Sequence, residues 1–354
     1  MDTLTQIALG TAIAQAGFSQ KLGKKALLVG AFGGLLPDLD FFLTLGGDHF
    51  SYMETHRGWS HSIIVLPFVA FLMAWLSMKW GIWDTRKMGE DKPSHVDHYW
   101  TWYLLCFLAL ITHPLLDLCT SYGTQILTPL SNARFTLDTV SIIDLIYTVP
   151  LLIAIIVGLF SFKKPQRAFV WAKYALVFST LYLCLGFFNS WDAKKQATIQ
   201  LKEQNFAFVD VHVSPTMLNN VLWRVVAKDK DDRFAVGFFS TIARKTIQFK
   251  IYESDNDKFV KAVNDSKEGK ILRWFSMNML RAQTQKIQNE KQEVILTDMR
   301  FGLVSQPAGS FFNGHFEFDK NDGLVRAYIP EGNREDLKPS MEINAILSKI
   351  KGDT

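Results

Sequence analysis

The chain has 354 residues, a formal net charge of +4 and 48% hydrophobic residues. This length allows two domains, and so small a charge gives no reason to expect nucleic acid as a partner. The charged residues are unevenly distributed: residues 1–191 carry 13 Lys or Arg and 12 Asp or Glu, whereas residues 192–354 carry 25 and 22. We therefore divide the chain into an apolar domain, residues 1–191, and a more polar domain, residues 192–354.

The apolar domain contains four uncharged segments whose lengths approach the roughly 20 residues that cross a bilayer. They are residues 62–78, 99–116, 145–162 and 174–191. A further segment, residues 26–47, is long enough but is interrupted by Asp38 and Asp40, and residues 4–18 form a shorter stretch of helical character. The pattern predicts an α-helical polytopic membrane domain of about five spans plus a short N-terminal helix.

Lysine and arginine gather in the connections on one side of these segments. That side carries Lys21, Lys24, Lys25, Lys79, Arg86, Lys87, Lys92, Lys163, Lys164 and Arg167. The other side has only Arg57, Arg134, Lys194 and Lys195. Because cytoplasmic loops carry an excess of Lys and Arg, we predict a multi-pass protein of the cell inner membrane with an extracytoplasmic domain at residues 192–354.

Three polar clusters lie beside or inside the apolar segments, at residues 37–40 (PDLD), 56–61 (HRGWSH) and 113–117 (HPLLD). The predicted topology brings all three to the extracytoplasmic side. Carboxylates and imidazoles are costly near hydrocarbon, so such a cluster indicates a functional site. The candidate metal ligands are Asp38, Asp40, His56, His61, His113 and Asp117.

A mixed set of nitrogen and oxygen ligands suits Zn²⁺, Mn²⁺ or Fe²⁺ better than Ca²⁺ or Mg²⁺, and zinc is the first expectation. His113 and Asp117 are four residues apart, a spacing that places both on one face of a helix. Arg57 is a fixed cation that can hold an anionic group through two parallel hydrogen bonds.

Three further polar residues are expected to act mainly at helix ends. Ser60 is expected to cap a helix that begins near residue 61. Asp138 and Asp144 precede the next apolar segment, where they can cap its helix or support the site.

These motifs together resemble a known family. They are the opening MDTLTQ, GGxxPDxD at residues 33–40, HRGWSH at 56–61, HPxxD at 113–117, and Tyr122-Gly123-Thr124 followed by Pro129. In this order they resemble the prokaryotic membrane-bound metal-dependent hydrolases, some of which are under LexA control. The resemblance covers roughly residues 1–160 and implies an inner-membrane enzyme with a divalent metal held by the His and Asp residues above. Many relatives carry histidine where this chain has Gln6, and Asp2 lies nearby as another candidate ligand.

For a hydrolase, Asp38 or Asp117 would take a proton from the attacking water, and Arg57 would neutralise charge on an anionic substrate such as a phosphodiester. A site at the outer interface favours lipid-linked or amphipathic small molecules, so membrane lipids are the expected partners; the sequence identifies no protein partner. Two alternatives stay open, a metal-binding transporter and a non-catalytic membrane sensor.

Beyond residue 191 the pattern changes to strand-length apolar and alternating runs. We predict strands at 206–213, 221–227, 234–240, 246–252, 293–300, 315–318 and 324–329, and helices at 257–264 and 271–281. This describes an α+β domain with a mainly antiparallel sheet. Its histidines, His212 and His315, stand singly in the sequence, and no spacing typical of a metal site or a nucleophile accompanies them.

Overall fold

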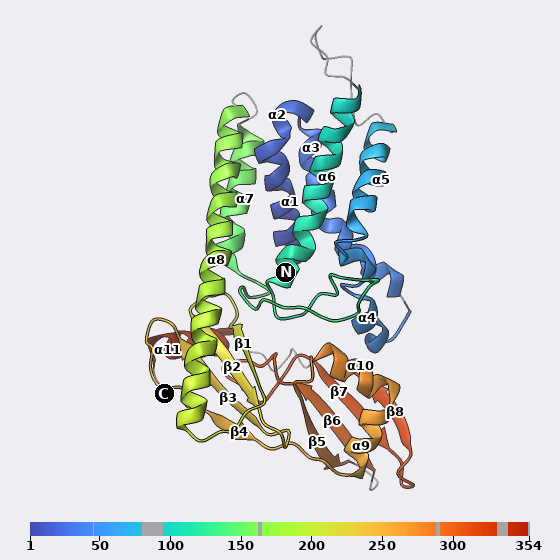
Figure 1. The fold of residues 1–354 in the computed structure, drawn as a ribbon, viewed down its shortest axis with the longest axis vertical. Coiled ribbons are helices and arrows are strands. Elements are labelled where there is room, and N and C mark those ends of the chain that lie inside the picture. Colours follow the sequence, from blue (N-terminus) through green and yellow to red (C-terminus); the bar gives the residue numbers. More distant parts are fainter. Residues whose placement is uncertain (45, 80–94, 162–164, 288–290, 331–338, 353–354) are drawn as a thin grey trace. The chain divides into compact units, whose positions relative to one another are not determined.

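The computed structural model describes residues 1–44, 46–79, 95–161, 165–287, 291–330 and 339–352 (Figure 1). The chain divides into two compact units. The first, which we call the helical unit, comprises Met1–Leu45, Thr55–Leu137 and Ile142–Leu185. The second, which we call the sheet unit, comprises Gly46–Glu54, Asp138–Ser141 and Gly186–Thr354. The domain boundary predicted at residues 191 and 192 falls inside helix α8 (Pro165–Glu203) and stays a prediction.

The N-terminal half of the chain is helical, as predicted. Its elements in chain order are α1 (Thr3–Gly17), α2 (Ser19–Leu22), α3 (Lys25–Leu35), the 3₁₀ helix η1 (Leu36–Thr44), α4 (His49–Thr55), the 3₁₀ helix η2 (Trp59–His61), α5 (Leu66–Lys79), α6 (His95–Leu118), α7 (Leu145–Phe160) and α8.

Two of these helices are long and apolar enough to cross a membrane, over Tyr99–Leu118 in α6 and Gln166–Glu203 in α8. A third candidate is a pair, His49–His61 and Leu66–Lys79, bent by 67° at the break between them. Helix α7 is apolar but shorter. The predicted segment 26–47 is not one helix, because α3 ends at Leu35 and η1 follows. The total of about five spans stays a prediction, and the cations at 86, 87, 92, 163 and 164 used to orient them lie outside the described residues.

Helices α1 and α3 pack backbone to backbone through glycines. A Cβ atom on Gly30 would lie 2.4 Å from the carbonyl oxygen of Gly10, and one on Gly34 would lie 2.3 Å from that of Gln6. Small residues allow this close approach, a common device between membrane helices. Gly34, part of the GGxxPDxD motif, thus brings the backbone of α3 against α1.

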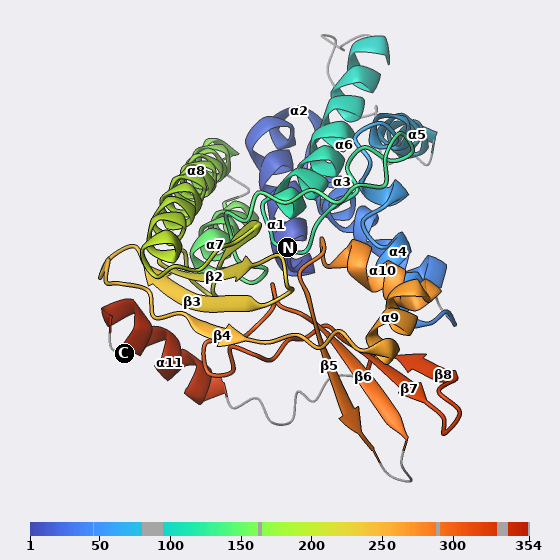
Figure 2. The same ribbon diagram turned by 60° about the horizontal axis from the view of Figure 1, so that its bottom comes forward.

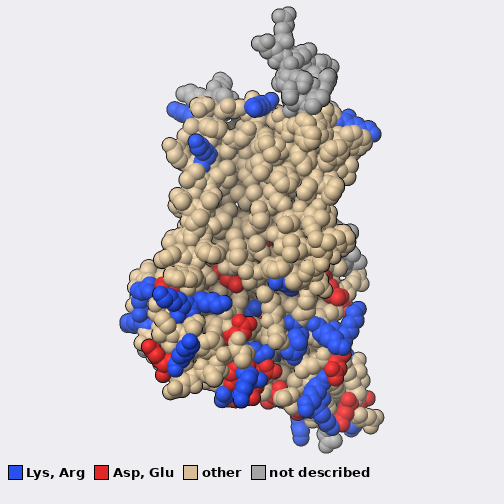
Figure 3. Space-filling model, viewed as in Figure 1, with Lys and Arg blue, Asp and Glu red and all other residues tan. Residues whose placement is uncertain are grey.

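The helical unit is apolar both inside and outside. Its core includes Trp102, Leu105 and Leu110 of α6 packed with Leu66 and Ala74 of α5. Large apolar side chains on the outside of α5, α7 and α8 are exposed. On the face shown in Figure 3, a broad band without charged residues crosses this unit, and Lys and Arg gather at the end that holds α2. This distribution is the one that a hydrocarbon environment requires.

The sheet unit contains two four-stranded antiparallel sheets (Figure 2). The first is β1 (Asp210–Pro215), β2 (Leu222–Lys228), β3 (Phe234–Ser240) and β4 (Lys250–Tyr252); the second is β5 (Leu280–Lys286), β6 (Gln292–Asp298), β7 (Asn313–Phe318) and β8 (Leu324–Tyr328). The unit also holds α9 (Lys258–Asp265), α10 (Lys267–Phe275) and α11 (Pro339–Lys351). Residues Ala193, Ala197 and Leu201 of α8 share a core with the first sheet.

The predicted α+β character with antiparallel strands is confirmed, although the strands form two sheets. The helix predicted over 271–281 is wrong in its second half. Helix α10 ends at Phe275, Met277 and Asn278 take positive φ angles of 51° and 68°, and strand β5 begins at Leu280. Strand β5 and helix α11 were not predicted from the sequence.

Candidate metal site

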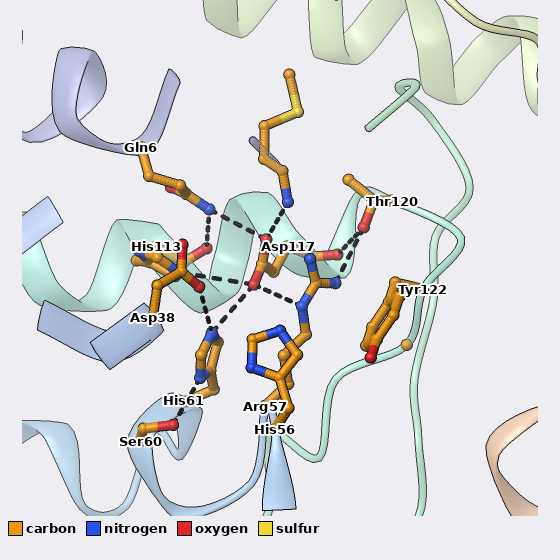
Figure 4. Close-up of polar contacts among 12 residues, drawn as sticks. Gln6, Asp38, His56, Arg57, Ser60, His61, His113, Asp117, Thr120 and Tyr122 are labelled. Carbon is orange, nitrogen blue, oxygen red and sulfur yellow. Dashed lines mark hydrogen bonds and ion pairs between the residues drawn. The ribbon is translucent and has the colours of Figure 1, made fainter. Parts of the chain in front are cut away.

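Four of the six predicted ligands meet in one cluster inside the helical unit (Figure 4). Asp38 comes from η1, His61 from η2, and His113 and Asp117 from neighbouring turns of α6. One nitrogen or carboxylate oxygen from each of the four lies within 4.8 Å of the others. Helix α6 continues through Pro114, so the spacing of four residues does place His113 and Asp117 on one face.

Three of the four side chains in the cluster are shielded from solvent. The side chains of His61, His113 and Asp117 are fully buried, whereas that of Asp38 is 16% exposed. His61 Nε2 lies 3.1 Å from Asp117 Oδ2, and His113 Nε2 lies 3.2 Å from Asp38 Oδ1. Within the described part of the chain, neither His61 Nε2 nor Asp117 Oδ2 has a hydrogen bond of acceptable geometry. Buried polar atoms without such bonds are costly unless another ligand satisfies them.

The backbone of α3 fixes the tautomer of His113. Its Nδ1 lies 2.6 Å from the carbonyl oxygen of Gly34, which can only accept, so Nδ1 carries the proton. In the neutral ring, Nε2 then presents its lone pair to Asp38 and Asp117. A backbone carbonyl in this position is a common partner of a metal-binding histidine.

The hydroxyl of Ser60 fixes the tautomer of His61. The Ser60 hydroxyl lies 2.6 Å from Asp40 Oδ2 and 2.8 Å from His61 Nδ1. A carboxylate only accepts, so the hydroxyl donates its one proton to Asp40 and accepts from His61 Nδ1. Nε2 of a neutral His61 is therefore unprotonated and faces the cluster.

Asp40 and His56, the other two predicted ligands, lie outside the four-residue cluster. They pair with each other, His56 Nδ1 lying 2.8 Å from Asp40 Oδ1. Asp40 Oδ2 also accepts the backbone N–H of Arg57 at 3.1 Å. Asp40 thus ties the 56–61 turn to η1, and the role of either residue as a ligand stays a prediction.

The predicted capping role of Ser60 is wrong, because its hydroxyl binds Asp40 and His61. Ser62 takes that role instead: its hydroxyl oxygen accepts the N–H groups of Ile64 and Val65 just before α5. The predicted cap at Asp144 is confirmed, since its carboxylate accepts the N–H groups of residues 146 and 147 at the start of α7.

Arg57 lies against the cluster in a left-handed backbone conformation, with φ of 62°. Its Nε lies 3.0 Å from Asp117 Oδ2, and a terminal nitrogen donates to the Thr120 hydroxyl at 3.2 Å. The guanidinium also covers the Tyr122 ring, 4.5 Å from its centroid, and Arg134 lies 5.2 Å from the same ring. Arg57 therefore places positive charge beside Asp117, while its predicted contact with substrate stays a prediction.

Further residues surround the cluster, and of these only Gln6 and Asp2 were singled out from the sequence. Gln6 Nε2 donates to Asp117 Oδ1 at 3.1 Å and to the His113 carbonyl at 3.2 Å, so the residue in the histidine position of many relatives does face the site. The amino group of Met1 also contacts Asp117 Oδ1. Asp2 instead caps α1 by accepting the N–H of Thr5. Thr120 and Arg134 carry no spacing signal, since only the fold brings them to the site.

A model of the YdjM inner membrane protein family matches residues 1–193. The chain belongs to this family. All the site residues named above lie within the matched region, and the protein is therefore assigned to the prokaryotic inner membrane. The expectation of an inner-membrane protein is thus confirmed, whereas hydrolytic activity stays a prediction.

One curated relative is the uncharacterized protein YfhP of Bacillus subtilis (strain 168), which is 27% identical over 152 residues. The match covers 41% of this chain and 42% of the relative, so more than half of each protein lies outside it. No solved structure matches the chain.

Proposed function

We propose that the protein is a membrane-embedded, metal-dependent hydrolase that acts on phosphoester or lipid-linked substrates at the extracytoplasmic face. One observation supports this most directly. His61 Nε2 and Asp117 Oδ2 are buried, 3.1 Å apart, and without a hydrogen bond of acceptable geometry among the described residues, although Asp117 Oδ2 also forms an ion pair with Arg57 Nε at 3.0 Å. Each is an electron-pair donor of the kind that a divalent cation satisfies.

Asp38, His61, His113 and Asp117 would hold the metal. Two imidazoles and two carboxylates fit zinc, with Mn²⁺ and Fe²⁺ as the other candidates. When bound, such a cation polarises the scissile group and makes a water molecule more acidic. The Gly34 carbonyl and the Asp40–Ser60 pair orient the two imidazoles, which is the supporting arrangement expected around a metal-binding histidine.

In this proposal His56 carries the proton. Its Nδ1 is held at 2.8 Å by the carboxylate of Asp40, and its ring lies with the centroid 5.8 Å from that of His61. A carboxylate on one ring nitrogen orients an imidazole for proton transfer at the other. We assign the general base to His56 Nε2 in place of the predicted Asp38 or Asp117, because those two belong to the ligand set.

The surroundings of the site favour a substrate that partitions into lipid. Phe41 and Phe42 on η1 are 41% and 54% exposed, and Trp59 on η2 is 63% exposed. These residues flank Asp38 and His61 in the chain, and Asp38 is the exposed member of the cluster. An apolar rim beside a metal site and the Arg57 guanidinium suits a lipid phosphoester better than a free phosphate ester, because apolar chains can pack against the rim. The proposal includes about five membrane spans with residues 192–354 outside the cytoplasm, as the cation count predicts.

Metal analysis of the protein purified in detergent tests the proposal. Asp38→Asn is the informative variant, because the residue is partly exposed and the change preserves its shape. Asp48→Asn is the matched control, since Asp48 is an exposed aspartate that accepts the N–H of Ser51 away from the cluster. We expect about one equivalent of metal in the wild type and the control, and at least a tenfold lower affinity in Asp38→Asn.

An activity assay then separates an enzyme from a sensor. Phosphatidylglycerol in mixed micelles and the soluble ester bis(p-nitrophenyl) phosphate are offered to the metal-loaded protein. We expect faster hydrolysis of the lipid and its loss in His56→Gln with metal content unchanged. Bound metal without hydrolysis of either ester would contradict the hydrolase and favour the sensor.

A further inference from the structure

A groove of about 730 Å³ lies between α3 and α5 in the helical unit. Its walls are formed by apolar side chains of both helices, among them Leu28, Phe32, Leu72 and Leu76. This volume is within the range of small-molecule binding sites. Both helices pack on α6, and the groove is the space that remains beside them.

The groove is polar at one end only. Lys25 lines the end where α3 begins, and Leu36 lines the opposite end. Among the described residues that line it, only Lys25 is charged. Lys21 and Lys24 precede it in the chain, and α5 ends at Lys79, whose ammonium lies 4.9 Å from the centre of the Trp75 ring. The groove thus has apolar walls along its length and a positively charged end at Lys25.

Its length fits one lipid chain. Helix α3 has 11 residues, and at 1.5 Å per residue it runs for roughly 16 Å. The hydrocarbon core of a bilayer is about 30 Å thick, so one leaflet offers chains of about 15 Å. Leu28 and Leu72 are 72% and 54% exposed, so in an inner-membrane protein the groove opens toward lipid.

We propose that the groove between α3 and α5 binds an anionic phospholipid, with an acyl chain between the two helices and the phosphate at Lys25. An ammonium at the level of the headgroups attracts an anionic phosphate, and basic residues between membrane helices are typical of such sites. The methyl end of the acyl chain lies toward Leu36. This site is separate from the metal cluster and does not depend on the proposed hydrolysis.

Photolabelling in nanodiscs tests the site. The probe is phosphatidylglycerol with a diazirine at the end of one acyl chain, diluted into phosphatidylcholine, and labelled peptides are mapped by mass spectrometry. We expect labels near Phe32 and Leu36. A second probe with the diazirine near the headgroup is expected to label near Lys25 and Leu28. The reverse order of labels, or equal labelling of α3 and α8, would overturn the proposal.

Two pairs of variants separate the chain from the headgroup. Leu72→Trp fills the groove and is expected to lower labelling at least fivefold, whereas Leu181→Trp, on the exposed face of α8, leaves it unchanged. Lys25→Gln is expected to lower the preference for phosphatidylglycerol over phosphatidylcholine about fivefold, as one interfacial cation contributes about 1 kcal/mol. Lys173→Gln, an exposed lysine of α8, is the matched control. An unchanged preference in Lys25→Gln would refute the assignment of the headgroup.

Discussion

Ser60→Ala tests whether the hydroxyl of Ser60 prepares His61 for metal binding. The hydroxyl links Asp40 Oδ2 at 2.6 Å to His61 Nδ1 at 2.8 Å, and the direct distance from His61 Nδ1 to Asp40 Oδ2 is 3.7 Å. Without the hydroxyl, the imidazole loses the acceptor that keeps the proton on Nδ1, and the carboxylate is too far to replace it. Nε2 can then carry the proton and cease to be a ligand.

The expected effect is that of removing a partner that orients a metal-binding histidine. Such changes lower metal affinity by roughly 10- to 100-fold, which corresponds to about 1.4 to 2.8 kcal/mol. Competition with a zinc indicator on the purified protein measures this ratio. Ser19→Ala is the matched control, because the hydroxyl of Ser19 donates to the carbonyl of Gln15 far from the cluster.

Two results would refute this reasoning. Wild-type zinc affinity in Ser60→Ala would show that the hydroxyl does not set the tautomer of His61. An equal loss in the Ser19 variant would show that the measurement reports general destabilisation. A partial rescue by Ser60→Thr, which keeps the hydroxyl, is expected if the hydrogen bond is the cause.

Three further predictions concern stability. Gly34→Ala places a methyl group against the carbonyl of Gln6 and is expected to lower the unfolding free energy by about 1–3 kcal/mol. Gly17→Ala, whose added methyl group would meet nothing within 4 Å, is the control and is expected to cause no such loss. Thermal unfolding in detergent compares the two variants. Asp144→Ala removes the α7 cap and is expected to lose about 1 kcal/mol in the same assay, with most of it kept by asparagine. Burial lowers the pKa of His212, so the folded protein holds this imidazole in its neutral form. The unfolded chain takes up a proton at this residue below about pH 6.5, and the free energy of unfolding should therefore fall by at most about 1.4 kcal/mol per pH unit as the pH drops below that value. Denaturation at two pH values should show a smaller pH dependence in His212→Gln, and an unchanged one would contradict this.

The strongest sequence signals were those of composition and helical spacing. The uncharged run at 99–116 predicted most of α6, which spans His95–Leu118, because 18 consecutive uncharged, mostly apolar residues have few alternatives to a membrane helix. The position of His113 and Asp117 on one helix face was predictable for the same reason, because a continuous helix places residues four apart on the same face. Strand β3 was predicted at its observed bounds, Phe234–Ser240, because the polar residues Arg233 and Thr241 flank an apolar run.

Short segments were harder to predict, because their structure depends on contacts with residues distant in sequence. The 271–281 run reads as one amphipathic helix, yet Leu280 pairs with Asp298 of β6 and becomes a strand residue. The spacing of residues in the sequence could not show that Asp40 binds Ser60 and His56, whereas Asp38, two residues earlier, lies in the cluster. That difference depends on the 3₁₀ geometry of η1 and on where the 56–61 turn lies against it.

The ligands around a bound metal test the central claim most directly. X-ray absorption at the zinc edge of the loaded, detergent-purified protein identifies the atoms around the ion. The account predicts nitrogen and oxygen ligands with the multiple-scattering signature of two imidazoles, reduced to one in His61→Gln. A sulfur ligand, a spectrum without imidazole, or an unchanged spectrum in that variant would contradict a cation held by Asp38, His61, His113 and Asp117.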